Sequence, residues 1–600
     1  MLKRLAGGIT RHPMLTLVVW LLIAAAGLSL AEFGVTGQGL FDRVESGAPR
    51  APDSESAKAD DAMTDAASSG QSLTLIVSGA DVANESVQAR IQPIVAQHRE
   101  RIARIPGVAN VTDPFSLPEG LDNPMAAPML AASGNGFLVT GEVDSSLDEL
   151  AAQTALDAMG AGLEAEAADL RAADPAIRTV VGGESMILGE LIDQMEADLV
   201  TGEVVSLPIA LIVMVVVFAG FAAASLPLLG ALASIAVALG SLFGFSYAMD
   251  LHTSVINVVT VVGLGLSIDY GLLIVSRFRE ELRARQVPRH GRERQRQVCA
   301  RAVAATLATA GRTVAFSALT IAASVAGLMV FKPAIYKAFG LGGLLVVLVA
   351  LMTAITLVPA CLMLIGARLS RPSLLSRLPV LGRLLPKSAE AAPESGLFSR
   401  LAGAVQGRPW LVIVGVLAVM AVLASPALHL QMRNSSTELL PPDSRQLDFV
   451  EQLDQDYPYA ATTPVIAVSR GSLEETEAWA NTAVAGLEHV SHVEVSQADG
   501  YVAMRVGLDV EDSAGAEATQ AAHAIRDLDP PFQVLVTGPA AHLIDFQAAL
   551  VDGAPWAAGI IGVVTLALLF LMTGSALIPI KALLTNALSL LACLGVVTWL

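Results

Sequence analysis

The sequence predicts an α-helical, polytopic membrane protein with two extracytoplasmic α+β domains, and three observations indicate this class. Hydrophobic residues make up 54% of the 600 residues and charged residues only 16%, and the mean hydropathy is +0.60, as expected when the bilayer is the solvent. Nine stretches have the roughly 20 apolar residues that a helix needs to cross about 30 Å of hydrocarbon. Two long acidic regions, 34–200 and 430–553, interrupt them.

The nine apolar stretches cover residues 13–33, 203–222, 226–248, 253–275, 314–334, 338–366, 409–429, 555–573 and 577–600. Lys3, Arg4 and the first stretch together could form a secretory signal peptide. An equivalent segment recurs at 409–429, where no signal peptide can stand, so we interpret the first stretch as a retained helix. Because the ninth stretch is still apolar at Leu600, we expect a truncated form of a longer protein; a naturally short form is the alternative.

The distribution of charge predicts the topology. The two acidic regions hold 27 acidic and 9 basic residues, and 20 acidic and 5 basic residues, whereas the loop 276–312 contains ten arginines. Short loops rich in Lys and Arg stay in the cytoplasm, so the N-terminus and the basic loops are expected inside and both acidic domains outside the cytoplasmic membrane. Specific binding of nucleic acid or anionic lipid by these arginines is an alternative that the topology does not require, and we expect no nucleic-acid partner.

The predicted domains follow in chain order. They are the first membrane helix within 1–33, the first extracytoplasmic domain 34–200, helices two to six within 201–366, a cytoplasmic linker 367–408, helix seven at 409–429, the second extracytoplasmic domain 430–553 and helices eight and nine within 554–600.

The two halves of the chain repeat one another. Arg4-Leu5-Ala6-Gly7 recurs as Arg400-Leu401-Ala402-Gly403 at an offset of 396 residues, and 218–227 aligns with 570–579 at an offset of 352. Parallel repeats of this kind are common in transporters.

Both outer domains show the order β-α-β-β-α-β, which is the ferredoxin-like motif. In the first domain the strands are expected at 72–78, 108–112, 136–143 and 177–181, and the helices at 85–104 and 146–170. In the second domain the strands are expected near 464–469, 490–496, 501–508 and 532–537, and the helices near 472–488 and 512–527. Residues 44–70, within the first domain, are polar and loop-like at their start.

One ionisable residue stands deep inside an apolar stretch. Asp269 lies in the fourth stretch, eight residues before the first arginine, or about 12 Å of helix rise. Burying its anion costs a few kcal/mol or more, which favours uptake of a proton. Tyr270 supplies a neighbouring hydroxyl that can donate to the carboxylate. We therefore predict that Asp269 and Tyr270 form a proton relay.

Other residues could support this relay or pack around it. Gly263, Gly265 and Gly271 would let another helix approach closely. Three hydroxyls on the fifth stretch share one face at spacings of three and four, and belong to Ser317, Thr320 and Ser324. The alternative is a structural aspartate that those hydroxyls satisfy. The sequence shows no catalytic cluster, metal-ligand spacing or nucleotide motif, so we expect no enzyme activity and no cofactor, with the proton gradient as the source of energy.

These motifs resemble the MmpL transporters of actinobacteria, within the RND superfamily, which include the trehalose-monomycolate exporter of mycobacteria. The segments that carry the resemblance are GLGLSIDYGLLIVSRFREEL at 263–282, PDSESAKA at 52–59, RTVAFSALTIAAS at 312–324 and STELLPPDSRQLDF at 436–449. The resemblance implies a twelve-helix, proton-driven exporter of lipids or lipid-like molecules, with Asp-Tyr pairs on the fourth and tenth helices. Asp269 and Tyr270 match the first pair, and the second would fall near position 621 of a longer chain.

The expected function is export of lipids or other hydrophobic molecules driven by the proton-motive force. Efflux of drugs or siderophores, and a non-transporting membrane protein that senses lipid, are the alternatives. The expected partners are the bilayer and a lipid-like substrate, and the sequence leaves open a homo-oligomer or envelope partner proteins.

Overall fold

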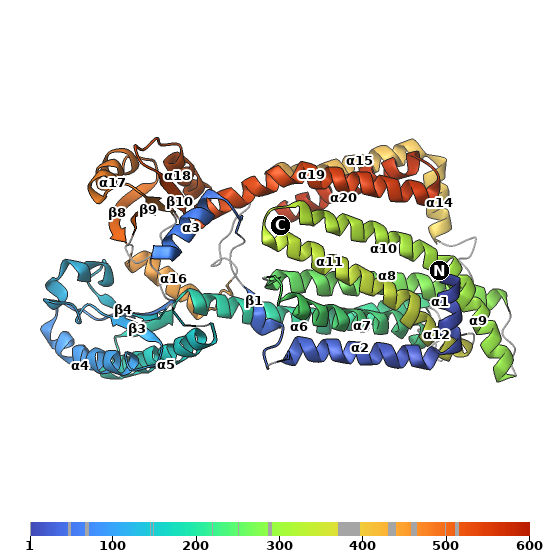
Figure 1. Cartoon of the computed structure of the whole chain (residues 1–600), viewed down its shortest axis with the longest axis horizontal. Helices are drawn as coiled ribbons and strands as arrows, with labels where there is room; N and C mark the ends of the chain where they lie inside the picture. Colours follow the sequence, from blue (N-terminus) through green and yellow to red (C-terminus); the bar gives the residue numbers. More distant parts are fainter. Residues whose placement is uncertain are drawn as a thin grey trace. The chain divides into compact units, whose positions relative to one another are not determined.

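The computed structural model describes residues 2–35, 37–45, 50–66, 71–144, 146–147, 149–218, 220–249, 251–285, 291–369, 397–429, 440–457, 465–498, 500–510 and 515–599. The chain divides into two compact units (Figure 1). The helical unit comprises 1–46, 199–432 and 549–600, and the mixed unit comprises 47–198 and 433–548. Most of the predicted linker 367–408 lies outside the described residues.

The helical unit contains long apolar helices. Its elements begin with α1 (Leu2–Arg11), α2 (Pro13–Phe33), β1 (Val44–Glu45), the end of α6 (Glu184–Phe218), α7 (Phe221–Phe245), β6 (Leu251–His252), α8 (Thr253–Ala284) and α9 (Arg292–Ala308). They continue with α10 (Ala310–Ala326), α11 (Ala334–Met352), α12 (Val358–Leu369), α14 (Leu397–Gly407), α15 (Pro409–Ala424), most of α19 (Pro539–Thr573) and α20 (Leu577–Trp599).

Eight helices in the described part of the chain are long and apolar enough to cross a membrane. They are Pro13–Phe33, Phe221–Phe245, Thr253–Ala284, Glu293–Val330, Ala334–Gly366, Pro409–Leu428, Pro539–Thr573 and Leu577–Trp599. The predicted stretch 203–222 corresponds to the end of α6, whose apolar segment Val204–Val215 is shorter; residue 219 within that stretch lies outside the described residues.

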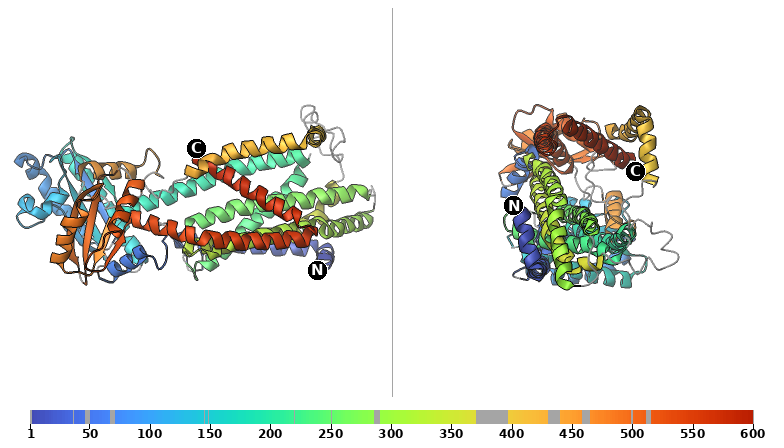
Figure 2. Two further views of the ribbon diagram at one scale, coloured as in Figure 1. Left: turned by 90° about the horizontal axis from the view of Figure 1, so that it is seen from above. Right: turned by 90° about the vertical axis from the view of Figure 1, so that its right-hand side faces the viewer.

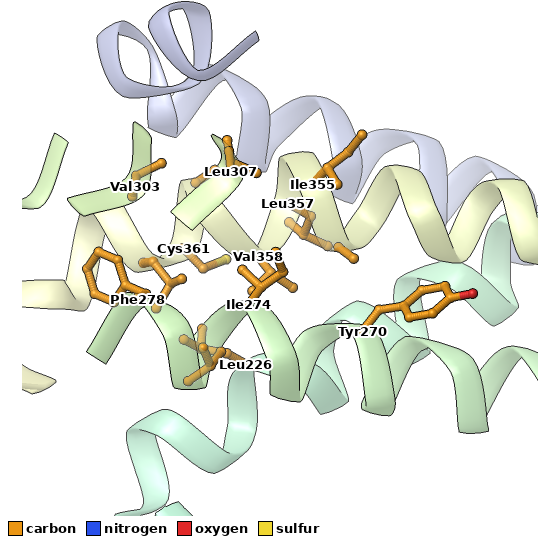
Figure 3. Close-up of a cluster of buried hydrophobic side chains, with 14 of the residues drawn as sticks. Leu226, Tyr270, Ile274, Phe278, Val303, Leu307, Ile355, Leu357, Val358 and Cys361 are labelled. Carbon is orange, nitrogen blue, oxygen red and sulfur yellow. The ribbon is translucent and has the colours of Figure 1, made fainter. Parts of the chain in front are cut away.

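The core of the helical unit lies between α7, α8, α9 and α12. Figure 3 shows part of it, where Ile274 and Phe278 of α8 face Leu226, Val303 and Val358 from the other three helices. All five side chains are at most 3% exposed. In a bilayer such side chains leave lipid rather than water, so close van der Waals packing, and not transfer from water, holds these helices together.

The mixed unit contains two modules with the same order of elements. The first module consists of β2 (Ser72–Ser78), α4 (Glu85–Ile102), β3 (Val108–Thr112), β4 (Gly136–Val143), α5 (Glu149–Ala173) and β5 (Arg178–Gly182). The second consists of β7 (Val465–Ser469), α17 (Leu473–Trp479), β8 (Val490–Ala498), β9 (Tyr501–Leu508), α18 (Ala516–Arg526) and β10 (Val534–Thr537). The order β-α-β-β-α-β that the sequence predicts is therefore present in both.

Each module has one antiparallel, four-stranded sheet. The strand order is β3-β4-β2-β5 in the first module and β10-β7-β9-β8 in the second, whose strands are orange in Figure 2. In both sheets the first and third strands of the module pair at the centre, and the second and fourth lie at the edges. The apolar faces of α4 and α5 pack with Leu73, Leu75 and Val77 of β2 to form the first module's core.

A connector helix precedes each module and packs on the other one. Helix α3 (Glu55–Ala66) lies against β10, where Glu55 accepts a hydrogen bond from the Val536 amide at 2.8 Å. Helix α16 (Arg445–Asp456) lies against β5 of the first module, where Gln446 donates to the Val181 carbonyl at 3.2 Å. Each half of the chain therefore completes the module of the other half.

The loop expected over 44–70 is wrong in its middle, because α3 occupies Glu55–Ala66. The Ser54 hydroxyl accepts a hydrogen bond from the Ala57 amide at 3.1 Å, which is the contact of a helix N-cap. Ser54 followed by alanine-rich sequence was the available signal. The polar composition of this segment gives no apolar stripe that would predict a helix. Helix α3 is stabilised instead by its packing on β10.

Candidate proton site on helix α8

Helix α8 presents the predicted relay residues. It begins after His252, whose Nδ1 accepts a hydrogen bond from the Ser254 amide at 3.1 Å, and it runs for 32 residues. Between Thr253 and Ser276 its only acidic or basic side chain is that of Asp269. A carboxylate is thus placed well inside a helix that is long and apolar enough to cross a membrane.

The Asp269 side chain lies on a face of α8 that the described residues leave uncovered. Asp269 is exposed, and so are Val261, Gly265 and Leu273, each four residues from the next. A spacing of four keeps side chains on one face of a helix. This face, defined by those four residues, is called the Asp269 face below.

Tyr270 points in a different direction. Its side chain is 1% exposed and belongs to the core between α7, α9 and α12, with the hydroxyl directed away from Ile274 (Figure 3). The expected hydrogen bond from Tyr270 to Asp269 is not formed, because the hydroxyl has no partner among the described residues. Consecutive residues of an α-helix diverge by about 100°, so one enters the core while the other faces outward.

Of the three predicted hydroxyls of α10, one lies near Tyr270. Ser317 is close to the Tyr270 hydroxyl, although the two do not form a hydrogen bond. Thr320 donates to the Phe316 carbonyl at 2.9 Å, and Ser324 donates to the Thr320 carbonyl at 3.0 Å. Since their protons are used within α10, Thr320 and Ser324 can act toward other groups only as acceptors.

The three glycines of α8 have different surroundings. A Cβ atom at Gly263 would lie 2.7 Å from Val346 of α11, and one at Gly271 would lie 2.7 Å from Pro227 of α7, whereas one at Gly265 would meet nothing within 4 Å. Gly263 and Gly271 therefore lie where α8 closely approaches α11 and α7. Gly265 lies on the Asp269 face, where no described helix approaches.

The inward side of α8 also carries a residue that the sequence analysis missed. Ser267 is 2% exposed, and its hydroxyl has no hydrogen-bond partner in the described ranges. It precedes Tyr270 by three residues, which places the two hydroxyls on one side of the helix. That spacing within Ser267-Ile268-Asp269-Tyr270 was the available signal. Unpaired polar groups buried in a helical unit are costly and are commonly retained for a function.

Ion pairs join several charged side chains at the arginine-rich end of α8. Arg277 forms ion pairs with Glu280 and Glu281, both at 2.8 Å, and Arg285 also pairs with Glu281. These are the i,i+3 and i,i+4 pairs of the SRFREE motif. The motif thus stabilises the end of the helix that carries Asp269.

The described residues offer no sign of a metal centre. No group of three or more His, Cys, Asp or Glu side chains among them could hold a metal ion. Cys299 and Cys361 are buried, and Cys593 is exposed; all three are free thiols. The chemistry available in the apolar part of α8, from Thr253 to Ser276, is that of one carboxylate and nearby hydroxyls.

Comparison with known proteins identifies relatives over the whole chain. A model of the MMPL family matches residues 48–412 and 438–600. A putative membrane protein of Streptomyces coelicolor is 34% identical over 603 residues, which cover 100% of this chain and 77% of the relative.

Named lipid exporters are also similar. The trehalose monomycolate exporter MmpL3 of Mycolicibacterium smegmatis is 31% identical over 71% of this chain and 45% of its own length. The mycolic acid-containing lipids exporter MmpL11 of the same organism is 36% identical over 40% of this chain and 23% of its own length. The chain thus spans less than half the length of these exporters.

The family match covers most of both units and includes α8 with Asp269 and Tyr270. The chain belongs to the MMPL family of membrane transporters and is not an enzyme.

Proposed function

We propose that this chain exports a lipid or another hydrophobic molecule from the cytoplasmic membrane and that proton movement through Asp269 drives the export. The observation that carries the proposal is the exposed carboxylate on the Asp269 face of an otherwise apolar membrane-length helix. The names of the relatives support the substrate class, since they are exporters of trehalose monomycolate and of mycolic acid-containing lipids.

Asp269 suits this role because its charge depends on what covers it. As an anion in hydrocarbon it costs several kcal/mol, and as a neutral acid it costs much less. A proton that binds when the Asp269 face is covered by apolar groups, and leaves when water reaches it, couples protonation to movement of helices. Tyr270, Ser267 and Ser317 lie on or near the inward side of α8, where they would sense such a movement rather than carry the proton.

The two modules of the mixed unit fit a role outside the cytoplasm. We interpret them as ferredoxin-like domains, since each has the strand order 4-1-3-2 of that motif when its strands are numbered from the N-terminus. The arginine-rich short loop 276–312 supports this location, because the positive-inside rule keeps such loops in the cytoplasm. In this arrangement they would receive the substrate that leaves the membrane.

The test is transport by the chain reconstituted in liposomes, with trehalose monomycolate as the probe. Export that requires a pH gradient, stops with a protonophore and falls at least tenfold in Asp269→Asn supports the proposal. Glu32→Gln is the matched control, because Glu32 is also exposed on a membrane-length helix but lies at the end of α2. Unchanged transport by Asp269→Asn would refute the proton role.

Two other results would replace the proposal. Efflux of a cationic dye, with no export of the glycolipid, would indicate a drug pump. Binding of the glycolipid at the same affinity with and without a pH gradient, and no export, would indicate a lipid sensor.

A further inference from the structure

Helix α1 has the features of a helix that lies at a membrane surface. His12 interrupts the helical backbone with φ −128° and ψ 57°, and Pro13 begins α2, so α1 turns across the end of α2 (Figure 1). Ala6 and Ile9 are buried, whereas Arg4 and Arg11 are exposed. An apolar side that packs inward and a basic side that faces outward are typical of interfacial helices.

Helix α9 packs beside α1 and presents more arginines. Buried Cys299, Ala302 and Val303 of α9 share one core with Ala6 and Ile9 of α1. The outward side of α9 carries exposed arginines. The α1–α9 basic surface is defined by Arg4, Arg11, Arg294, Arg296 and Arg301, all of which are exposed.

The fold brings two of these arginines together. The Arg296 guanidinium donates a hydrogen bond to the Arg11 carbonyl at 3.2 Å. The positive-inside rule accounts for arginines in this part of the sequence, but it does not require segments 285 residues apart to pack against each other with their arginines exposed. Several like charges on one surface repel one another unless an anion binds there.

The described carboxylates do not supply that anion. Within the described ranges none of the five arginines forms an ion pair, and the only acidic residue on α1 or α9 is Glu293. Some other arginines of the fold do have such partners: Arg277 and Arg285 pair on α8, and Arg526 pairs with Asp545 at 2.7 Å. The α1–α9 basic surface is thus an uncompensated cationic surface.

We propose that the α1–α9 basic surface binds the phosphate headgroups of anionic phospholipids. Guanidinium groups form paired, charge-assisted hydrogen bonds with phosphate oxygens. Helix α1 leads into the apolar helix α2, and α9 leads into α10, which enters the apolar stretch after Arg312. Both helices therefore lead into a membrane span from its basic side, where anionic lipid headgroups attract arginines.

The test compares two fluorescent lipids with the same tails, phosphatidylglycerol and phosphatidylcholine, for binding to the purified chain in neutral detergent. We expect tighter binding of phosphatidylglycerol. The double variant Arg11→Gln/Arg296→Gln should lower that affinity about thirtyfold, at about fivefold per arginine near a lipid phosphate, and leave the affinity for phosphatidylcholine unchanged. Arg11→Lys/Arg296→Lys should retain most of the affinity because the charge remains.

Matched controls separate this site from general electrostatics. Arg178→Gln/Arg505→Gln removes two exposed arginines of the mixed unit and should not change the affinity. Arg294→Gln/Arg301→Gln alters side chains that form no ion pair among the described residues, and it should weaken binding even if the Arg11/Arg296 variant fails to fold.

Several results would overturn the proposal. They are equal affinity for the two lipids, unchanged binding in both glutamine variants, or complete displacement of phosphatidylglycerol by free inorganic phosphate or by an RNA oligonucleotide. Binding in detergent requires no transport, so the outcome is independent of the proposed export function.

Discussion

Replacement of Glu166 by glutamine is expected to stabilise the first module at neutral and alkaline pH. Glu166 lies on α5 with a side chain that is 0% exposed, and neither of its carboxylate oxygens has a hydrogen-bond partner in the described part of the chain. Burial, and to a lesser extent the nearby Asp113 carboxylate, raise the pKa of Glu166 against a smaller lowering by Arg99, and the net pKa is about 8. Arg99 itself is held by Asp113 at 2.7 Å.

The size of the effect follows from the two pKa values. In the unfolded chain the pKa of Glu166 is near its ordinary 4.5. Below pH 4.5 the carboxyl is protonated in both states and costs nothing. Above it the unfolded state ionises first, so the module loses about 1.4 kcal/mol per pH unit until the pH passes the folded pKa. Glutamine is neutral throughout, so the variant should gain about 3 kcal/mol at pH 7 and about 5 kcal/mol above pH 8 relative to the native residue.

Hydrogen exchange of the α5 amides, corrected for the intrinsic exchange rate at each pH, measures this local stability. The native chain should lose protection steadily between pH 5 and pH 8, and Glu166→Gln should not. Asp157→Asn is the control, because Asp157 is an exposed carboxylate on the same helix. Equal pH dependence in the native chain and Glu166→Gln would refute the assignment of a buried, protonated Glu166.

Three further predictions concern packing and the connectors. Gly263→Ala should destabilise the contact of α8 with α11 by about 1–3 kcal/mol, whereas Gly265→Ala should raise helix stability by up to about 1 kcal/mol; equal thermal stability of the two variants in detergent would contradict the packing. Tyr457→Phe removes a 3.3 Å hydrogen bond to a backbone carbonyl of the first module. It should speed hydrogen exchange of the α16 amides about fivefold, which corresponds to a loss of about 1 kcal/mol. Burial raises the pKa of Asp60, but hydrogen bonds from His542 and a neighbouring threonine lower it more, so the net pKa lies below 3.8. Its contribution to the docking of α3 is therefore present above pH 3.8 and lost as the pH falls through the lowered value, and α3 should exchange faster there in the native chain but not in Asp60→Asn.

The strands of the mixed unit could be predicted because alternation of apolar side chains is a local signal. The first three predicted strands, 72–78, 108–112 and 136–143, coincide with β2, β3 and β4. Asp269 was found for the same reason, since one charge among apolar residues is visible in any short window. Its orientation was not, because the face that a helix leaves uncovered depends on which helices pack against the other faces.

The exchange of connector helices also left no local signal. Contacts such as that between Tyr457 and Val77 join residues 380 positions apart, and periodicity within a short window carries no information about them. The three glycines of α8 show the same limit, because Gly265 and Gly263 look alike in sequence and differ only in what lies beside them.

The exchanged connectors have a consequence for biosynthesis. The Val77 carbonyl accepts its hydrogen bond from Tyr457, which is synthesised 380 residues later. At about 5–20 residues per second, the ribosome needs tens of seconds to reach Tyr457. During that time the surface of the first module that binds α16 is uncovered. Helix α3 has no docking surface yet, because the second module has not been synthesised. A second chain made on a neighbouring ribosome could supply the missing connector helix or module. Chains synthesised close together would then exchange connector helices and form domain-swapped pairs. Cells that make this protein would gain from keeping its nascent chains apart until β10, which ends at Thr537, has emerged.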